Sequence, residues 1–590
     1  MNDRYFREEL SYLVEQGREF ARQHPDLASR LNLNDSRGRD PNVERLMEGF
    51  AFLTSRIRQR LDDDFPELVE GLLSLIWPHH GRPIPSFCLV EFSPASGQAL
   101  TGLEIPLGAE IGSQPLSQQL RCRYRTCAPL TVLPIFLASV SAESLGSASR
   151  ITLDFTVSPG ADVASLATNP IRVQLYGELG VCHQLYELLL GKEADRRYLQ
   201  GAKVQAKHKG GAYNLNLGPE SIRPAGFESN ESLLPTGEAA LWSFNILLDY
   251  FLFQEKFQAF WLDGLKPLAG LEELSGFTVQ FDFNHAWPTN LHLSKRELRL
   301  NCVPAANLFS SEGEPIRLDR RSSEYKVQVD TQNNEFYQVF SVDRVEGMVL
   351  ADGRRRRYQP FMAARKPLDG EAENLDGPYY VLTRKSSPWE GLDVYMSFID
   401  NLGKGELPSQ ETVSLSLTCS NGSYGAEPLP GQIDEPISGV PDALKVRNIT
   451  QPVAPVFPDP EGKSLWNWLS HASLNYLDLA SVNRLRMLLG LLDQRGDEAN
   501  ARRIQGVASA KMERVREMVM GSLLTGNKLT VGLDEDHFAD LGDVQIFARA
   551  LAAFVGVYAS INSFVDLEVQ LTGSGKSIHL GRKQGYSNSL

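Results

Sequence analysis

The stretch DPNVERLMEGFAFLTSRIRQRLDDDFPEL, residues Asp40 to Leu68, decides the fold of the N-terminal region. It predicts one long helix, because Asp40 is a natural N-cap and Pro41 suits a first helical turn. Pro66 ends the helix after a run of aspartates, which are poor helix formers. Apolar residues recur along it at three- and four-residue spacing, which predicts a single apolar stripe. The stripe contains Val43, Leu46, Met47, Phe50, Leu53, Ile57 and Leu61.

An apolar stripe of this length needs other helices to pack against. The flanking sequence predicts two of them, one from Phe6 to Ala21 and one from Glu67 to Trp77, so the N-terminal region should be a helical bundle. Two interpretations remain open on the residues alone. The three helices could pack only on one another, or the stripe could dock against the helices of another chain.

Composition places the chain among soluble globular proteins. It has 590 residues, of which 42% are hydrophobic and 22% charged, a length typical of about four domains. A net charge of -14 and a pI near 5.4 argue against nucleic acid or an anionic membrane as the main partner. Six scattered cysteines form no disulfide framework. The charged N-terminus resembles no signal peptide, so we expect a cytoplasmic protein.

Changes in residue composition and hydrophobic pattern along the chain predict an α+β multidomain protein with four regions. Residues 1–82 are the helical region, and residues 83–300 alternate short β-type runs with helical segments as a mixed α+β domain. Residues 301–455 form the most strand-like region, rich in Gly, Pro, Asn and Asp turns. A proline-rich linker then leads to residues 456–590, a C-terminal α+β domain.

The sequence Gly573-Ser574-Gly575-Lys576-Ser577 copies the end of a phosphate-binding loop. A true P-loop also needs a glycine where this chain has Gln570, and a following helix whose N-terminus faces the phosphates. Only a polar, glycine-broken segment follows here, which predicts a flexible C-terminal tail. We therefore expect no nucleotide cofactor.

Three groups of residues could in principle hold a metal ion, and each has a simpler structural interpretation. His79 and His80 lie in a proline-rich loop with no further histidine at ligand spacing, and Cys122 and Cys127 have the wrong spacing for zinc. The run Asp534 to His537 is typical of a strand end that passes into a loop or cap. No catalytic motif appears, so we expect no enzyme activity, no metal and no cofactor.

Two further segments have open interpretations. The arginines of 354–357 form a positive patch on an acidic chain, either a solvated loop or a docking loop for an acidic partner. Trp466, Trp468 and Tyr476 lie close together after the linker, where such aromatic residues are either core or the anchor of an interface.

Several segments, in this order, resemble one known family. They are EELSYLVEQGREFARQHPDLASRL (Glu8–Leu31), the Asp40–Leu68 helix, PHHGRPIPS (Pro78–Ser86), NLFSSEGEPIRLDRRSSEYKV (Asn307–Val327), LSHASLNYLDL (Leu469–Leu479), GLDEDHF (Gly532–Phe538) and VYASINSF (Val557–Phe564). The family is TssF, also called VasA or ImpG, the baseplate wedge subunits of bacterial type VI secretion systems. The similar segments span nearly the whole chain, and their joint occurrence is specific.

The resemblance implies a structural role rather than catalysis. Two TssF-like chains would form a wedge with one TssG, which TssK and TssE join around the VgrG hub. The wedges would support the Hcp tube and the TssB–TssC sheath, at the cytoplasmic face of the inner membrane. The resemblance favours docking of the apolar stripe against another chain, because wedge proteins of this kind interlock through helices of unlike subunits. The competing hypotheses are a multidomain binding protein with strand-rich recognition modules and, more weakly, a hydrolase with its site in the loops of residues 301–455.

Overall fold

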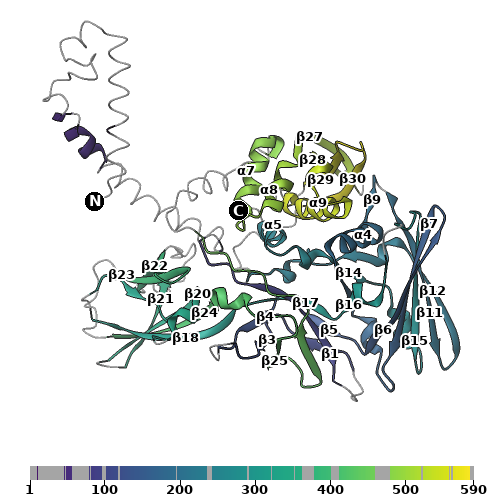
Figure 1. Ribbon diagram of the computed structural model, residues 1–590, viewed down its shortest axis with the longest axis horizontal. Coiled ribbons are helices and arrows are strands. Elements are labelled where there is room, and N and C mark those ends of the chain that lie inside the picture. The colour runs from purple at the N-terminus through teal and green to yellow at the C-terminus, as the bar shows by residue number, and fades with distance from the viewer. Residues whose placement is uncertain are drawn as a thin grey trace, which may run out of the picture. The chain divides into compact units, whose positions relative to one another are not determined.

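The fold is given by a computed structural model of the chain (Figure 1). It describes residues 10, 45–46, 48–55, 79, 81–95, 101–116, 120–194, 196–235, 242–288, 292–319, 322–331, 333–350, 353–361, 378–399, 411–458, 479–519, 522–556, 559 and 563–584. The chain is mixed α+β and rich in strands, as its sequence predicts. It divides into two compact units, Met1–Leu75 with Glu461–Ala472, and Ile76–Pro460 with Ser473–Leu590.

In the first unit, the described part of the predicted long helix is helical at residues 45–46 and 48–55. The rest of that helix and the two flanking helices lie outside the described residues. The N-terminal bundle therefore stays a prediction, as do the domain limits at 82, 300 and 455.

The centre of the second unit is a six-stranded sheet in the order β25-β3-β4-β17-β1-β26. Its strands come from both predicted central regions. β3 and β4 are close in sequence, but other pairs join distant parts of the chain, as in Val90↔Asn448. The strands are β1 (Phe87–Pro94), β3 (Glu110–Ser113), β4 (Arg123–Thr126), β17 (Cys302–Ala306), β25 (Ile433–Ser438) and β26 (Leu444–Asn448). Val90, Tyr124 and Val303 are fully buried in the core on this sheet. A small pair of strands, β2 (Leu103–Ile105) and β5 (Leu130–Val132), adds Ile105 and Val132 to that core.

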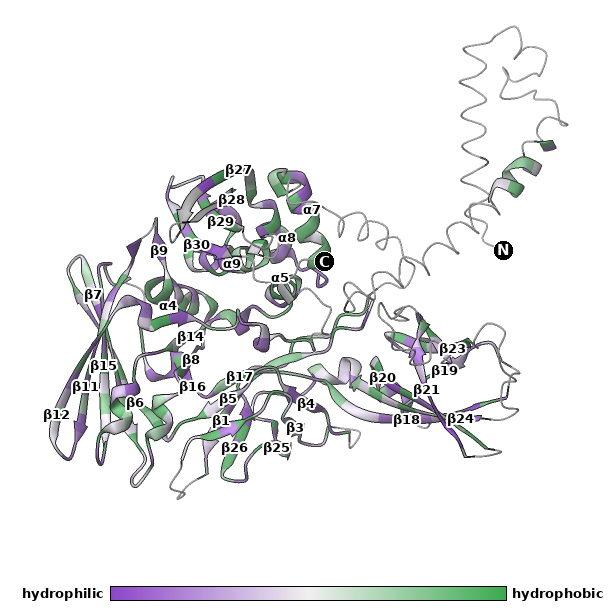
Figure 2. Ribbon diagram, turned by 180° about the vertical axis from the view of Figure 1, so that it is seen from behind, coloured by the Kyte–Doolittle hydropathy of each residue, from purple (hydrophilic) through white to green (hydrophobic). Residues whose placement is uncertain are grey.

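Two further sheets form the rest of the mixed region. Strands of the first alternate between buried apolar and solvent-facing residues, and Figure 2 shows this alternation along β7 and β15. It has the order β12-β11-β15-β7-β6, and its strands are β6 (Ile135–Leu145), β7 (Ala148–Val157), β11 (Leu199–His208), β12 (Gly211–Leu217) and β15 (Gly276–Phe283). The second has the order β13-β14-β8-β16, with β8 (Ile171–Leu175), β13 (Ile222–Pro224), β14 (Ala259–Leu262) and β16 (Leu298–Leu300). A short ribbon joins β9 (Lys192–Glu193) to β10 (Arg196–Arg197).

The strand-rich third region folds around a seven-stranded sheet in the order β18-β24-β20-β21-β22-β23-β19. Its strands are β18 (Phe309–Leu318), β19 (Tyr325–Lys326), β20 (Gln338–Val349), β21 (Arg355–Pro360), β22 (Tyr379–Ser386), β23 (Leu392–Ile399) and β24 (Glu411–Ser420). The loop assignment of 354–357 is wrong for its last three arginines, which lie in β21 opposite Glu346 to Met348 of β20. Backbone pairing with β20 overrides the low strand preference of a charged run.

The C-terminal region packs a sheet and three helices against α4 (Leu179–Leu190) and α5 (Trp242–Leu252) (Figure 1). Its sheet has the order β27-β28-β29-β30, with β27 (Val507–Val519), β28 (Ser522–Leu533), β29 (Phe564–Leu571) and β30 (Ser577–Gln584). Its helices are α7 (Val482–Leu492), α8 (Glu498–Gln505) and α9 (Leu541–Val555). Helix α9 contacts both α4 and α5, and nearly all of its residues are buried.

A buried carboxylate joins these elements. Asp543 of α9 is 0% exposed. It accepts hydrogen bonds from Arg503 Nε of α8 at 2.9 Å, Gln254 Nε2 at 2.7 Å and the Tyr250 hydroxyl of α5 at 3.1 Å. Arg503 also donates to Asn500 Oδ1, at 3.1 Å. The cluster therefore fixes the C-terminal helices on the mixed region by satisfying one desolvated charge.

Arg503→Ala should destabilise the second unit strongly, because it leaves the Asp543 carboxylate buried without its counter-ion. Breaking such a pair costs about 3–5 kcal/mol, which urea denaturation would measure. The control is Arg502→Ala on the same helix, whose exposed side chain donates only to a backbone carbonyl. It should cost below about 1 kcal/mol. Equal losses in the two variants would contradict a special role for the Arg503–Asp543 pair.

Candidate partner interface

The described part of the N-terminal helix exposes three large apolar residues. Leu46, Phe50 and Leu53 are 76%, 58% and 61% exposed. Their spacing of four and three residues places them on one face of the helix. On the other side of the helix Ala51 and Ser55 are buried, at 0% and 6%. Because large apolar side chains rarely line up in solvent without a partner, this face is the candidate interface.

The remaining predicted interface residues cannot be added to this face. Val43, Met47, Ile57 and Leu61 lie outside the described residues, and so do Trp466, Trp468 and Tyr476. The assignment of these seven residues to an interface stays a prediction.

Burial of the exposed stripe would stabilise a complex appreciably. Fully burying one Leu or Phe side chain contributes about 1.5–3 kcal/mol. Leu46, Phe50 and Leu53 together would therefore offset a large part of the roughly 4–15 kcal/mol that association costs in lost freedom of motion. Phe50 has the largest side chain of the three and lies at the centre of the stripe.

The Gly573–Ser577 segment, which copies the end of a P-loop, has another role in the structure. It is the turn of a β-hairpin between β29 and β30, and β30 pairs along β29. The prediction of a flexible tail is therefore wrong for Ser577–Gln584, where backbone pairing supplies the order that the polar sequence does not indicate. Ser574 N donates to Glu535 Oε2 at 2.7 Å, which places a carboxylate against the turn. Since a strand follows Lys576 and a carboxylate faces the turn, the geometry does not suit phosphate binding.

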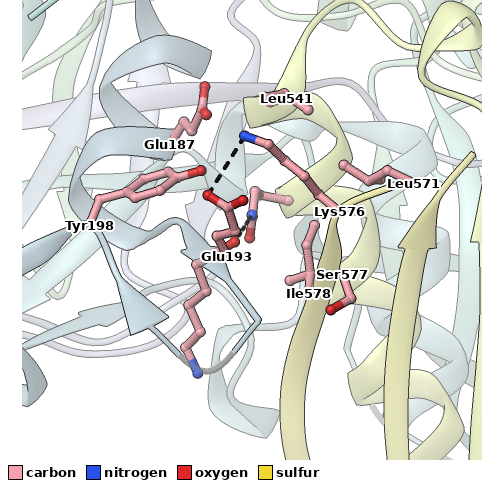
Figure 3. A pocket seen from close by; sticks show the side chains of 10 residues that line it. Glu187, Glu193, Tyr198, Leu541, Leu571, Lys576, Ser577 and Ile578 are labelled. Carbon is pink, nitrogen blue, oxygen red and sulfur yellow. Dashed lines mark hydrogen bonds and ion pairs between the residues drawn. The ribbon is translucent and has the colours of Figure 1, made fainter. Parts of the chain in front are cut away.

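Lys576 lines a small pocket between the β9 ribbon and the C-terminal sheet (Figure 3). Its ammonium lies 3.6 Å from the Glu193 carboxylate, and Glu187 and Tyr198 face the same space (Figure 3). The pKa of Glu187 is raised from 4.5 to about 7, chiefly by burial and also by the nearby Asp540 carboxylate, while Lys576 lowers it. A carboxyl with this pKa could act as a general acid or base. The pocket, however, has room for only about one water molecule, so no substrate fits beside it.

The groups considered for metal binding have ordinary structural roles. Asp534 caps a short 3-10 turn, Glu535–His537, and accepts from the Asp536 backbone at 3.3 Å. Burial raises the pKa of the Cys122 and Cys127 thiols to about 12, which disfavours the thiolate that zinc requires. His79 is 1% exposed, and burial lowers its pKa to about 3. His80 lies outside the described residues, among which no three potential ligands gather.

The sequence patterns do not indicate the side chains that join the C-terminal helices to the mixed region. Asp543, Arg503 and Tyr250 come together from three helices, and no motif marks them. The one available signal was the pair of ionisable residues, Asp543 and Arg549, inside the otherwise apolar α9 sequence. Arg549 donates to the Leu190 backbone carbonyl. A charge in a buried helix indicates a buried partner.

Comparison with known proteins identifies what the chain is similar to. The model of the family described as "Type VI secretion system, TssF" matches residues 2–583. A curated relative, the type VI secretion system component TssF1 of Pseudomonas aeruginosa, is 28% identical in an alignment of 631 positions that covers 99% of both chains.

Two solved structures agree over most of the chain. One is a chain of the TssK-TssF-TssG baseplate subcomplex of a type VI secretion system, with a TM-score of 0.73 and 28% identity over 92% of this chain and 99% of that chain. The other belongs to the baseplate complex from the type VI secretion system, with a TM-score of 0.61 and 27% identity over 99% of both chains. In the described residues, no helix is long and apolar enough to cross a membrane.

The raised pKa of Glu187 predicts a pH-dependent stability. The unfolded carboxyl ionises near pH 4.5 and the folded one only near pH 7, so the native state should lose stability as pH rises between these values. Glu187→Gln should remove this loss and raise the free energy of unfolding at pH 8 by about 1–2 kcal/mol, after allowance for partial exposure. At pH 4.5 the effect should be small. Thermal melting at both pH values measures it, and equal effects would contradict the assigned cause.

All six cysteines are buried and unpaired with one another. Under native conditions we expect slow reaction with a thiol reagent, because burial limits access and raises the pKa of these thiols. After denaturation without any reductant, six thiols per chain should react. A lower count would show that disulfides form.

Proposed function

Because the chain belongs to the TssF family of type VI secretion systems, we propose that it is a non-enzymatic structural subunit of the baseplate that assembles with TssG-like and TssK-like chains. One observation carries the proposal: an exposed apolar stripe of Leu46, Phe50 and Leu53 on a chain that aligns along 92% of its length with a member of a TssK-TssF-TssG subcomplex. The stripe is the surface that we assign to the TssG-like partner.

The finer assembly follows from the family resemblance. In it, two copies of this chain and one TssG form a wedge, and TssK and TssE join that wedge around the VgrG hub. The assembled baseplate supports growth of the Hcp tube and the TssB–TssC sheath at the inner-membrane face. The docking of helices from unlike subunits is what gives the stripe a role in this arrangement.

The geometry favours this role over the competing ones. The pocket beside Glu187 is too small for a hydrolase substrate, and a hydrolase site in the loops of residues 301–455 is separated from the baseplate role by the copurification test below. A solitary binding protein would have no use for a helix that presents apolar residues to solvent. Coexpression with a TssG-like chain, followed by native mass measurement, separates these classes, since only a wedge subunit should copurify in a fixed ratio.

The decisive substitution is Phe50→Asp. If the stripe packs against a partner's helices, the new carboxylate would be buried without a counter-ion, at a cost of several kcal/mol. The variant should lose the TssG-like chain in copurification, while its second unit still melts cooperatively near the wild-type temperature. Calorimetry and native mass measurement give the two readouts.

Arg45→Asp is the matched control on the same helix. Arg45 is exposed and lies well away from the Leu46–Phe50–Leu53 face, so its substitution should leave the complex intact. Loss of the cooperative fold in Phe50→Asp would instead make the stripe internal core. Unchanged copurification would show that this helix does not hold the complex.

A further inference from the structure

Gly49 leaves a recess in the exposed apolar stripe. It is helical and exposed, and its neighbours on the helix surface include Leu46, Phe50 and Leu53 of the stripe. Apart from its chain neighbours and the backbone of its own helix, a Cβ added to Gly49 would meet no described atom within 4 Å. The backbone at Gly49 is therefore open beside three large exposed side chains. We call the surface lined by Leu46, Gly49, Phe50 and Leu53 the Gly49 recess.

The described contacts of the chain give no reason for a glycine at position 49. Glycine inside a helix disfavours that helix by about three- to fivefold relative to alanine. The φ angle of Gly49 is not in the left-handed region that requires glycine. At Gly542 of α9, by contrast, an added Cβ would lie 2.1 Å from the His183 carbonyl oxygen, so internal packing explains that glycine. A partner that approaches the helix backbone closely would explain Gly49.

An open helical glycine alone would not indicate a docking site. Gly490 of α7 is also exposed, and a Cβ added there would likewise meet no described atom within 4 Å. Among the residues of α7, however, Met487 is the only large apolar one that is exposed, so no apolar rim surrounds Gly490. Gly49 differs because an open backbone and three exposed apolar side chains occur together on one helix face.

The spacing of the four lining residues indicates which structure the partner presents. Positions 46, 49, 50 and 53 are spaced as i, i+3, i+4 and i+7, the four-residue hole that receives one side chain, the knob, from a facing helix. The side chains at such a contact set the distance between two packed helices, so a glycine in the hole allows a close approach. An extended strand would instead place backbone N–H and C=O groups against an apolar surface that cannot bind them. A helix is therefore the better occupant.

We propose that the Gly49 recess receives one large apolar side chain from a helix of the TssG-like chain. The missing side chain at position 49 then determines how closely that helix packs. The proposal rests on the proposed function, which assigns the stripe to this partner. Ala51 and Ser55 are buried on the other side of the helix, so that side is not available for docking. A second copy of this chain is the poorer occupant, because a net charge of -14 disfavours self-association.

Competition between full-length variant and wild-type chains tests the proposal. The two chains are coexpressed with a limiting amount of the TssG-like chain, and the complex is isolated through that partner. Peptide mass spectrometry counts both chains in the complex, since position 49 lies in a single tryptic peptide, Leu46–Arg56. Gly49→Leu should be depleted about tenfold or more relative to its share in the lysate, because the leucine fills the recess. Equal incorporation of the two chains would overturn the proposal.

Gly49→Ala separates docking from folding, because its two effects have opposite signs. Alanine favours the helix, so the isolated chain should keep or raise its melting temperature, while the added methyl group should lower incorporation by about threefold. Gly490→Leu is the matched control, since it makes the same change at an open helical glycine without an apolar rim, and it should be incorporated like the wild type. Equal depletion of Gly490→Leu, or a lower melting temperature for both Gly49 variants, would contradict the proposal.

A compensating substitution in the partner identifies the knob. Each large apolar residue in the helices of the TssG-like chain is replaced by alanine, one at a time, and combined with Gly49→Leu. One of these replacements should restore incorporation, because the leucine then occupies the space that the knob has left. Failure of every replacement would contradict a single side chain in the recess.

The remaining outcomes separate this inference from the proposed function. If the wild-type chain forms no complex with the TssG-like chain, the proposed function itself fails. If Phe50→Asp loses that complex and Gly49→Leu keeps it, only the inference about the Gly49 recess fails. Dimerisation of the isolated chain that Gly49→Leu abolishes would identify a second copy as the occupant and would also overturn the inference.

Discussion

The desolvated carboxylate of Asp543 is the constraint on which the C-terminal half of the structure depends. A charge that is 0% exposed is tolerated only when several donors surround it. Arg503, Tyr250 and Gln254 supply them, so two helices and a short turn must meet at the start of α9. The neighbouring pair of Lys256 and Asp249, joined at 2.6 Å and 1% exposed on both sides, follows the same rule within the mixed region. Buried charges here determine which elements can be neighbours.

Close packing of α9 against α4 also fixes the position of the C-terminal helices. A Cβ at Gly542 would lie 2.1 Å from the His183 carbonyl oxygen, so α9 approaches α4 as only glycine permits. At this contact the His183 ring lies 3.1 Å from the Asp540 carboxylate, which also caps α9 by accepting from the Asp543 backbone. The cap, the glycine and the buried ion pair all lie within the first turn of α9. That turn therefore sets the position of the C-terminal sheet relative to the mixed region.

Much of the local structure could be predicted from the sequence, because periodicity and caps are local. The sequence of residues 482–492 predicts a helix and that of residues 564–571 a strand, and the structure has both with the same bounds, Val482–Leu492 and Phe564–Leu571. Helix α8 and strand β30 were missed for identifiable reasons. Of the residues of α8, only Asn500, Arg503 and Ile504 are buried, so no apolar stripe marks it. Strand β30 takes its order from pairing with β29 rather than from its own side chains.

The arrangement of strands could not be predicted for a different reason. The central sheet pairs β1 with β26 across more than three hundred residues, and no local pattern encodes a contact of that separation. The proline-rich linker illustrates the point. Its residues, 451–460, contain four prolines and predict an extended segment. The structure adds a pairing that this pattern does not indicate, because Val456 and Ile84 exchange backbone hydrogen bonds. Of the interface residues predicted from the stripe, Leu46, Phe50 and Leu53 are the ones that the structure describes, and all three are exposed.

The second unit buries ion pairs such as Arg503–Asp543 and Lys256–Asp249, whereas the described part of the N-terminal helix exposes an apolar face. An ion pair such as Arg503–Asp543 is specific but costly to separate, which suits a permanent contact between elements of one chain. An apolar helix face can exist in water before a partner arrives, because it contains no desolvated charge. Such a surface gains free energy only on assembly, through apolar burial. A subunit that must fold before it joins a larger particle requires this separation between internal and external interactions.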